Sequence, residues 1–299
     1  MKILVIGGSY FLGRWFVELA HKKHSVTVLN RGSIKVGLPG VTELVCDRHD
    51  AEGLKKLSCN EYDAVVDLCA YKKGDIEGII NVFGRNSAKY IFVSTVDVYE
   101  HSDGIVTEDS PLRTAFPAGP EGEYLKGKAE LEKELKAVCE KRGMNPISVR
   151  PAVLYGPANY APREKMFFDW ISRAGQIILP SDSDGLFYMT YASDAALAIL
   201  DICESSKVTG AYNLVPPSPE TYESFAAALH AGASIPFTEI KLPVKEIEDR
   251  NIPMPFPIKK SESYLIASEK IKDLGVSFMP LDEGIRRTWS VNLSGGRMP

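Results

Sequence analysis

The first thirty residues constrain the fold most, because they read as a buried strand, a glycine turn and a helix. The apolar run "KILVI" (2–6) leads into "GGSYFLG" (7–13), and the amphipathic stretch "RWFVELAHKK" follows. The first glycine of such a turn permits a tight bend, and the last one lets the helix pack closely on the strand. Amides at the start of the helix favour a negatively charged group. This opening predicts a strand–turn–helix unit that cradles a phosphate.

Short apolar runs rich in β-branched residues alternate with helical patterns through the first half of the chain. Near-continuous apolar strands indicate burial on both faces, and their alternation with helices predicts a parallel sheet covered on both sides. We therefore expect an α/β fold, a Rossmann-like doubly wound parallel sheet, with its ligand beyond the carboxyl ends of the strands. The expected strands span 2–6, 25–30, 42–47, 63–70, 89–95 and 146–152.

Proline-rich connections change this rhythm from Gly156 onward, where "YGPANYAP", "LVPPSPE" and "NIPMPFPIKK" separate helical pieces. A strand-like return, "LFYMTYASDAALAIL", precedes a last expected strand at "GAYNLVPP". We expect a dinucleotide-binding domain made of 1–160 plus about 187–213. A smaller, discontinuous C-terminal lobe of about 161–186 plus 214–299 is expected to bind the substrate.

Composition excludes several classes of protein. The 299 residues carry a net charge of -4 and a pI near 5.8, which argues against a nucleic-acid binder with a broadly basic surface. No apolar run approaches the roughly 18 residues of a membrane span, and "MKILVI" is too short for a signal peptide. The five cysteines form no CxxC pair, so we interpret Cys46 and Cys69 as reduced core residues. A cytoplasmic protein without nucleic-acid or membrane partners is expected.

The glycine turn lacks the middle glycine of dinucleotide fingerprints, and Tyr10 stands there; its ring is tolerated if it points away. The second strand ends in Asn30, where a site that prefers NAD carries a carboxylate. Arg31 follows, and a guanidinium pairs a 2′-phosphate with two hydrogen bonds. We expect NAD(P), with a preference for NADP, although Arg31 also reads as a solvated loop charge. The expected dinucleotide contacts in the first half are Gly7, Ser9, Tyr10, Phe11, Leu12, Gly13, Asn30, Arg31, Asp47 (at the adenine amino group), Leu68 and Ala70.

Tyr124 and Lys128 lie four residues apart in "EYLKGKAELE", so a helix running to about Arg142 places both on one face. An ammonium near a phenol lowers the phenol pKa, which makes Tyr124 a candidate acid or base near neutral pH. Thr95 ends the fifth expected strand, where its hydroxyl would meet a substrate oxygen. Without the other motifs, Tyr124 and Lys128 are also compatible with an ordinary exposed pair on a helix. Thr95 is likewise compatible with a strand-end residue that bonds backbone groups.

These motifs together resemble the extended short-chain dehydrogenases/reductases, the family of NAD(P)-dependent sugar-nucleotide epimerases and dehydratases. The matching segments are the glycine turn, "STVDVY", "YLKGK" with Glu132, "VRPAVLYGP", "YASDAALAIL", "ASEKIKDLG" and "PLDEGIRRT". The resemblance implies that Tyr124 exchanges a proton with a substrate hydroxyl while the nicotinamide exchanges hydride. It further implies that Lys128 lowers the Tyr124 pKa and holds the nicotinamide ribose, and that Thr95 orients the oxygen. Tyr155 and Asn159 would touch nicotinamide and substrate, and two copies would pair as a homodimer.

Three departures from the family pattern affect function. The form "GGSYFLG" resembles a divergent branch that includes chloroplast stem-loop RNA-binding proteins. Val96 stands where dehydratases carry an aspartic acid, although Asp97 follows it. An Arg-Pro-Gly-Asp segment near the substrate diphosphate is absent, and "PFPIKKSES" stands in that region. The expected substrate contacts are therefore Asp97, Asn159, Arg163 and Lys259.

Three functions remain open from the sequence. The first is epimerisation or related remodelling of a nucleotide sugar by transient hydride transfer, and the second is NADPH-dependent reduction of a small aldehyde or ketone. The third is a non-catalytic protein that senses a dinucleotide or associates with RNA. No metal site is expected, because "HKKH" (21–24) lacks a third ligand and "SDSDG" (181–185) lacks the closing glutamate of a calcium loop.

Overall fold

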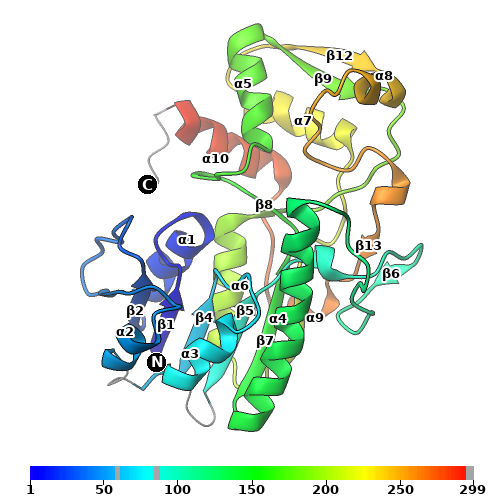
Figure 1. Cartoon of the computed structure of the whole chain (residues 1–299). Helices are drawn as coiled ribbons and strands as arrows, with labels where there is room; N and C mark the ends of the chain where they lie inside the picture. Colours follow the sequence, from blue (N-terminus) through cyan, green and yellow to red (C-terminus); the bar gives the residue numbers. More distant parts are fainter. Residues whose placement is uncertain (58–60, 84–87, 294–299) are drawn as a thin grey trace.

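The computed structural model of the chain describes residues 1–57, 61–83 and 88–293. In this described part, seven strands form one parallel sheet in the order β11-β7-β5-β4-β1-β2-β3 (Figure 1). The predicted doubly wound α/β fold is confirmed. Strand order reverses between β1 and β4, which is where such a sheet opens a ligand crevice. The strand bounds are β1 Lys2–Ile6, β2 Ser25–Asn30, β3 Thr42–Val45, β4 Ala64–Asp67, β5 Lys89–Val93, β7 Asn145–Pro151 and β11 Gly210–Leu214.

Helices cover both faces of this sheet, and the alternation of buried side chains along β1 explains how. Ile3 and Val5 pack into one core with α1 and α6, whereas Leu4 and Ile6 pack into the opposite core with α3 and α4. Since successive strand residues point to opposite faces, an all-apolar strand needs a helical layer on each side. The helix bounds are α1 Phe11–Ala20, α2 Ala51–Lys56, α3 Asp75–Phe83, α4 Pro120–Arg142 and α6 Ala192–Glu204.

Three expected strands end earlier than predicted, at Val45, Asp67 and Val93. The residues that follow make local bonds that turn the chain. Asp47 accepts the His49 amide at 2.9 Å, and Thr95 caps the short helix η1 (Val96–Val98). The predicted site residues beyond these ends therefore lie at the carboxyl edge of the sheet.

A second set of elements lies beyond that edge, in the upper part of Figure 1. It has its own core, which includes Phe167, Phe225 and Trp289. The predicted domain boundaries stay a prediction, but the segment 214–299 does not lie entirely in this upper part, because Ile271 belongs to the sheet core. The remaining bounds are β6 Ile105–Val106, β8 Val153–Tyr155, α5 Glu164–Ala174, β9 Gln176–Pro180, β10 Met189–Tyr191, α7 Tyr222–Gly232, β12 Thr238–Leu242, α8 Val244–Asp249, η2 Lys260–Glu262, β13 Leu265–Ile266, α9 Glu269–Lys272 and α10 Leu281–Leu293.

Candidate dinucleotide and substrate cleft

The glycine turn between β1 and α1 has the close approaches that its sequence predicts. Gly7 has a φ of +90°, which favours glycine, and a Cβ on Gly13 would lie 2.3 Å from the Gly7 carbonyl oxygen. Tyr10 is the N-cap of α1 without a side-chain cap bond, and no acidic residue stands in the first helical turn. The first amides of α1 are thus free of a capping carboxylate, as an anion site requires.

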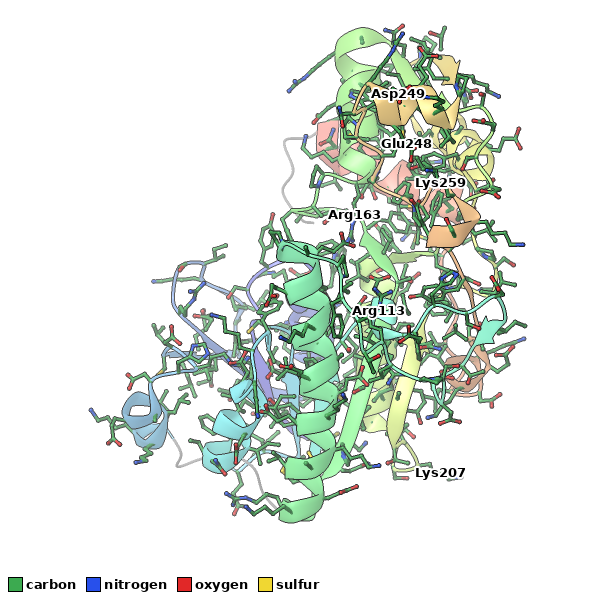
Figure 2. The ribbon with its side chains drawn as sticks, turned by 45° about the vertical axis from the view of Figure 1, so that its right-hand side comes forward. Arg113, Arg163, Lys207, Glu248, Asp249 and Lys259 are labelled. Carbon is green, nitrogen blue, oxygen red and sulfur yellow. The ribbon has the colours of Figure 1, made fainter. Side chains whose placement is uncertain are left out.

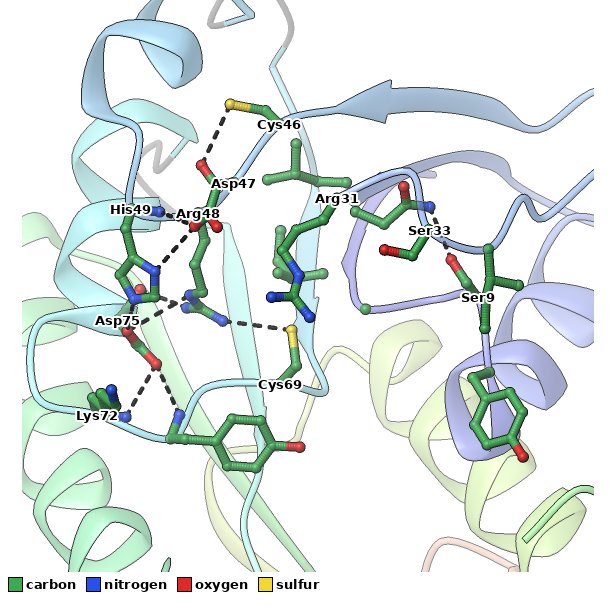
Figure 3. Close-up of a pocket in the computed structure, with 17 residues that line it drawn as sticks. Ser9, Arg31, Ser33, Cys46, Asp47, Arg48, His49, Cys69, Lys72 and Asp75 are labelled. Carbon is green, nitrogen blue, oxygen red and sulfur yellow. Dashed lines mark hydrogen bonds and ion pairs between the residues drawn. The ribbon is translucent and has the colours of Figure 1, made fainter. Parts of the chain in front are cut away.

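A cavity of about 380 Å³ opens beside this turn, over the ends of β1, β2 and β3 (Figure 3). Arg31, Ser33 and Asp47 line it. Asn30 also lines it, but its amide is engaged: the nitrogen donates to Ser9 Oγ at 2.8 Å and the oxygen accepts from the Gly32 amide at 2.8 Å. Asn30 therefore ties the end of β2 to the glycine turn.

A buried ion-pair network forms the floor of the same cavity, and the sequence reasoning missed it. Both terminal nitrogens of Arg48 donate to the fully buried Asp67, at 2.9 and 2.8 Å, and the Tyr90 hydroxyl donates to the same carboxylate at 2.6 Å. His49 Nε2 lies 2.8 Å from Asp75 Oδ1. The only sequence signal was a carboxylate at the end of an apolar strand, since buried charges are normally paired.

The cysteines fit the expectation of reduced thiols. Cys46, Cys69, Cys139 and Cys203 are free, and Cys59 lies outside the described residues. Cys69 lies under the glycine turn, and burial, followed by the charge of Asp67, raises the pKa of its thiol to about 11. Cys69 is therefore a packing residue of the cleft and not a nucleophile.

A second cavity, of about 390 Å³, joins the glycine turn to the predicted catalytic residues. Gly7, Tyr10, Cys69 and Tyr71 line both cavities, so the two lie end to end. Most of the residues that the sequence predicted for the dinucleotide or substrate site also line this second cavity. They are Phe11, Leu12, Gly13, Leu68, Thr95, Asp97, Tyr124, Lys128, Asn159 and Arg163.

Lys128 lies beneath two tyrosine rings of this cavity. Its Nζ lies 4.7 Å from the centre of the Tyr71 ring and 5.7 Å from that of Tyr124. The ammonium donates to the carbonyl oxygens of Ala70 at 2.9 Å and Val93 at 2.8 Å, and the residue is 2% exposed. Burial lowers the pKa of Lys128 to about 8. Ala70 thus contributes its carbonyl to Lys128, and its own side chain is fully buried.

The predicted lowering of the Tyr124 pKa by Lys128 is wrong. Desolvation of the phenol oxygen, and next the charge of Asp97, raise the pKa of Tyr124 above its usual value, although 40% of the residue as a whole is exposed. The Lys128 ammonium is directed at two backbone carbonyls and not at the phenol oxygen. Tyr124 is therefore protonated at neutral pH, as an ordinary tyrosine is, and has a proton to donate.

Thr95 satisfies local groups at the strand end, as one of its two interpretations expects, and its contact with a substrate oxygen stays a prediction. Its hydroxyl donates to Asp97 Oδ2 at 2.9 Å and accepts from the Asp97 amide at 3.2 Å, which caps η1. It also lines the cavity with Asp97 and Tyr124. A hydroxyl held by a carboxylate in this way has a fixed orientation in the cavity that Tyr124 also lines.

Tyr155 is a correction to the predicted dinucleotide contacts. Its side chain is fully buried in the upper core, with its ring centre 5.3 Å from that of Tyr191. The pairing of β8 with β10 places both residues at matching positions, and Gly284 leaves room for the Tyr155 hydroxyl. Tyr155 therefore packs the upper core and does not line the cleft.

Lys259 is a second correction. It lies beside α8 in the upper part, where it forms an ion pair with Glu248, whereas Arg163 lies at the junction with the sheet (Figure 2). Arg163 lines the cleft and donates to the Leu154 carbonyl at 3.2 Å. Of the two cations proposed for a substrate phosphate, Arg163 alone reaches the described cleft.

The cleft also contains residues that the sequence did not single out. Tyr71 and Tyr160 line it, and Glu164 lies behind its wall with 1% of its surface exposed. Tyr71 follows the predicted fourth strand and Tyr160 lies in a proline-rich loop, and neither position carries a pattern that marks an exposed aromatic ring.

Two expectations concern features that were predicted to be absent. Within residues 1–57, 61–83 and 88–293, no helix has the length and apolar character needed to cross a lipid bilayer. The same described residues hold no cluster of three or more acidic, histidine or cysteine side chains that suits a metal ion.

Comparison with known proteins supports the fold and points in two functional directions. A family described as "NAD dependent epimerase/dehydratase family" matches residues 76–214. The chloroplast stem-loop binding protein of 41 kDa b from Arabidopsis thaliana is 28% identical, over 99% of this chain and 80% of that protein. The UDP-glucose 4-epimerase of Thermotoga maritima, solved with UDP-glucose, superposes with a TM-score of 0.77 at 19% identity, covering 99% of each chain.

A further solved relative is the UDP-glucose 4-epimerase of Thermus thermophilus in complex with NAD. It gives a TM-score of 0.73 at 20% identity and covers 97% of this chain and 98% of its own. The family match, the sheet order and the glycine turn agree with one another. Residues 76–214 thus resemble the NAD-dependent epimerase/dehydratase family, and the chain shares the fold of these solved epimerases over nearly its whole length.

Proposed function

We propose that the chain binds a nicotinamide dinucleotide and uses Tyr124 to exchange a proton with the oxygen of a hydroxyl or carbonyl substrate. The observation that carries this proposal is the pair of cavities that run end to end from Arg31, past the glycine turn, to Tyr124. The turn fits a diphosphate, because a side chain at Gly13 would fill the space beside Gly7.

When bound, the dinucleotide supplies the hydride donor or acceptor. Glycine-turn amides and the start of α1 would hold its diphosphate, and Lys128 lies buried where it would meet the ribose. Tyr124, whose pKa is raised, would donate its proton to a carbonyl oxygen that becomes a hydroxyl. Thr95 would orient that oxygen from its place beside Tyr124.

The charges that line this part of the cleft favour a small carbonyl substrate over a nucleotide sugar. A nucleotide sugar carries two phosphate charges, and the cations that line this part of the cleft are Arg163 and the buried Lys128. The family fold alone does not choose between the two reactions.

For the dinucleotide, we propose a preference for NADP. Asn30 removes the carboxylate that would repel a 2′-phosphate, and Arg31 and Ser33 line the same cavity. The presence of NAD in a solved relative at 20% identity concerns that relative only.

A second function is favoured by a different observation. The relative that matches this chain over nearly its full length is named a stem-loop binding protein, so association with an RNA stem-loop is the competing proposal. The cleft favours the enzyme and this comparison favours RNA. The net charge of -4 opposes broad binding to a phosphate backbone. A cytoplasmic location and a homodimer remain predictions from the sequence.

One set of experiments separates these functions. NADPH and NADH oxidation by the purified protein would be followed with a panel of small aldehydes, ketones and UDP-sugars. Tyr124→Phe should lower turnover by roughly 10²–10⁴-fold and leave dinucleotide affinity unchanged. Tyr71→Phe, which removes a hydroxyl from the same cavity, is the matched control and should retain activity. Equal turnover of wild type and Tyr124→Phe would contradict the mechanism.

The RNA proposal has its own readout. Retention of a stem-loop RNA would be measured from low to physiological salt, together with a single-stranded RNA of the same composition. Binding that survives physiological salt and prefers the stem-loop would support the second function. Loss of all retention at moderate salt would remove it.

A further inference from the structure

The turn 156–163, between β8 and α5, has an unusual backbone for its sequence. Gly156 has a φ of +129° and Ala158, a residue with a side chain, has a φ of +63°. A non-glycine residue in the left-handed region costs free energy and persists where surrounding contacts hold it. The bonds around this turn identify what holds it.

Glu164 is the centre of these bonds. Its Oε1 accepts the Gly156 amide at 3.0 Å and the Asn159 side-chain nitrogen at 3.2 Å, and its Oε2 accepts that same nitrogen at 3.0 Å. The side-chain oxygen of Asn159 accepts the Ala161 amide at 3.0 Å, which extends the network along the turn. A carboxylate that is 1% exposed is costly to bury; these donors compensate for part of that cost, and burial still raises the pKa of Glu164 to about 7.

The tip of the turn reaches across to the glycine turn. The ring centre of Tyr160 lies 6.1 Å from that of Tyr10 and 6.1 Å from that of Phe11, with the Phe11 ring edge-on at 84°. Tyr160 is 73% exposed and Tyr10 is 44% exposed. Exposed aromatic rings gathered at the mouth of a cavity are typical of ligand-binding surfaces.

We propose that Glu164 is a positioning residue for the dinucleotide cleft, and that it holds the turn 156–163 so that Tyr160 covers the glycine turn. This inference rests on the proposed binding of a dinucleotide. Tyr160 is the residue that would touch the bound molecule, and Glu164 acts through the turn that carries Tyr160. Tyr10, in place of the middle glycine, supplies the surface on which Tyr160 packs. The cover would slow release of the dinucleotide without taking part in proton exchange.

The experiment measures release of NADPH and of NADH from the full chain by stopped-flow fluorescence. Tyr160→Ala changes an exposed side chain, so the protein should fold normally and release the dinucleotide about tenfold faster, as expected for loss of about 1.4 kcal/mol of ring contact. Glu164→Ala should speed release to the same extent. Glu164→Gln should fall between wild type and Glu164→Ala, because its amide oxygen still accepts the Gly156 amide.

A double variant and a matched control complete the design. Glu164→Ala combined with Tyr160→Ala should release no faster than either single variant, because both act through one contact. Lys165→Ala removes the neighbouring exposed ion pair with Asp169 on α5 and should release at the wild-type rate. Unfolding midpoints measured in parallel identify any variant whose effect comes from general destabilisation.

The outcomes separate this inference from the proposed function. Wild-type binding with unchanged release from Tyr160→Ala would overturn the inference and leave dinucleotide binding intact. Additive effects in the double variant would show that Glu164 does not act through Tyr160. Absence of any NADPH or NADH binding by the wild type would overturn both proposals.

Discussion

The two ends of the cleft are built on different principles. At the nucleotide end, the charged groups of the floor are bonded to one another, with Arg48 and Asp67 buried beneath the cavity. At the reaction end, the described tyrosines Tyr71, Tyr124 and Tyr160 present 48%, 40% and 73% of their surface to the cavity and solvent. The first end is fixed before any ligand arrives, and the second presents rings that a ligand would cover.

This difference reflects two separate requirements, one for binding a dinucleotide and one for binding a substrate. A dinucleotide has one shape, so its site benefits from groups that are already in place and lose little freedom on binding. Proteins of one fold act on different substrates. Exposed tyrosine rings and a single buried lysine restrict the shape and charge of a substrate only weakly. Variants at the nucleotide end should therefore affect folding most strongly, and variants at the reaction end should affect ligands.

The largest expected effect is at Asp67. Asp67→Ala leaves the buried Arg48 charge with only the longer ion pair to Asp75, at 3.8 Å, and removes the acceptor of the Tyr90 hydroxyl, so the free energy of unfolding should fall by about 3 kcal/mol. Urea denaturation measures the loss. Asp169→Ala breaks an exposed pair with Lys165 and should cost less than about 1 kcal/mol. A similar small loss for Asp67→Ala would mean that the nucleotide end is no more fixed than the surface.

Lys128 lines the reaction end of the cleft and gives a pH-dependent prediction. Burial lowers its pKa from an ordinary value of 10.5 to about 8, so between these pH values the unfolded chain holds a proton that the folded chain has released. Folding stability of the wild type should therefore rise with pH in this window relative to Lys128→Met, by about 3 kcal/mol in total. Below the folded-state pKa the difference between the two proteins should be constant.

Denaturation at a series of pH values that spans this window tests the prediction. Subtracting the Lys128→Met curve removes the titration of other groups that both proteins share. A difference that stays flat across the window would show that Lys128 titrates near its ordinary pKa. In that case it would be solvated, and the floor of the reaction end would be open.

The glycine turn gives a third, smaller effect. A Cβ at Gly13 would lie 2.3 Å from the Gly7 carbonyl oxygen and 3.0 Å from Gly8 Cα, so Gly13→Ala should cost about 1–3 kcal/mol of stability and weaken dinucleotide binding. Gly78 also lies in a helix, and a Cβ there meets nothing within 4 Å. Gly78→Ala is the matched control and should stabilise the chain by up to about 1 kcal/mol. Equal stability of the two variants would contradict the close approach.

The fold was predictable because it depends on local patterns. All-apolar runs such as 2–6 need cover on both faces, and the glycine turn needs a strand before it and a helix after it, so the order of elements follows from the sequence. The position of Tyr124 and Lys128 on one helix face follows from their spacing. These inferences require no knowledge of what lies across the cleft.

The rest of the site depends on contacts between distant segments. Asp67 and Arg48 are 19 residues apart, and nothing in either segment marks them as partners. Whether Tyr155 faces the cleft or the upper core depends on how β8 pairs with β10, which the sequence of β8 does not state. The upward shift of the Tyr124 pKa comes from desolvation and from the charge of Asp97. Neither cause can be inferred from the spacing of Tyr124 and Lys128.

The smallest expected effect concerns Arg31, and it tests whether the fixed nucleotide end also selects its ligand. Arg31 lines the cavity from an exposed position, so it contributes little to folding and acts through ligand charge alone. If it pairs a 2′-phosphate, Arg31→Ala should lower the ratio of NADPH to NADH affinity by about tenfold, close to 1.4 kcal/mol. Asn30→Asp should lower the same ratio by repulsion. Arg173→Ala, at an exposed position on α5, makes the same change in net charge and should leave the ratio unaltered. Equal ratios in wild type, Arg31→Ala and Arg173→Ala would identify Arg31 as a solvated loop charge, and selection would then rest on the groups beneath it.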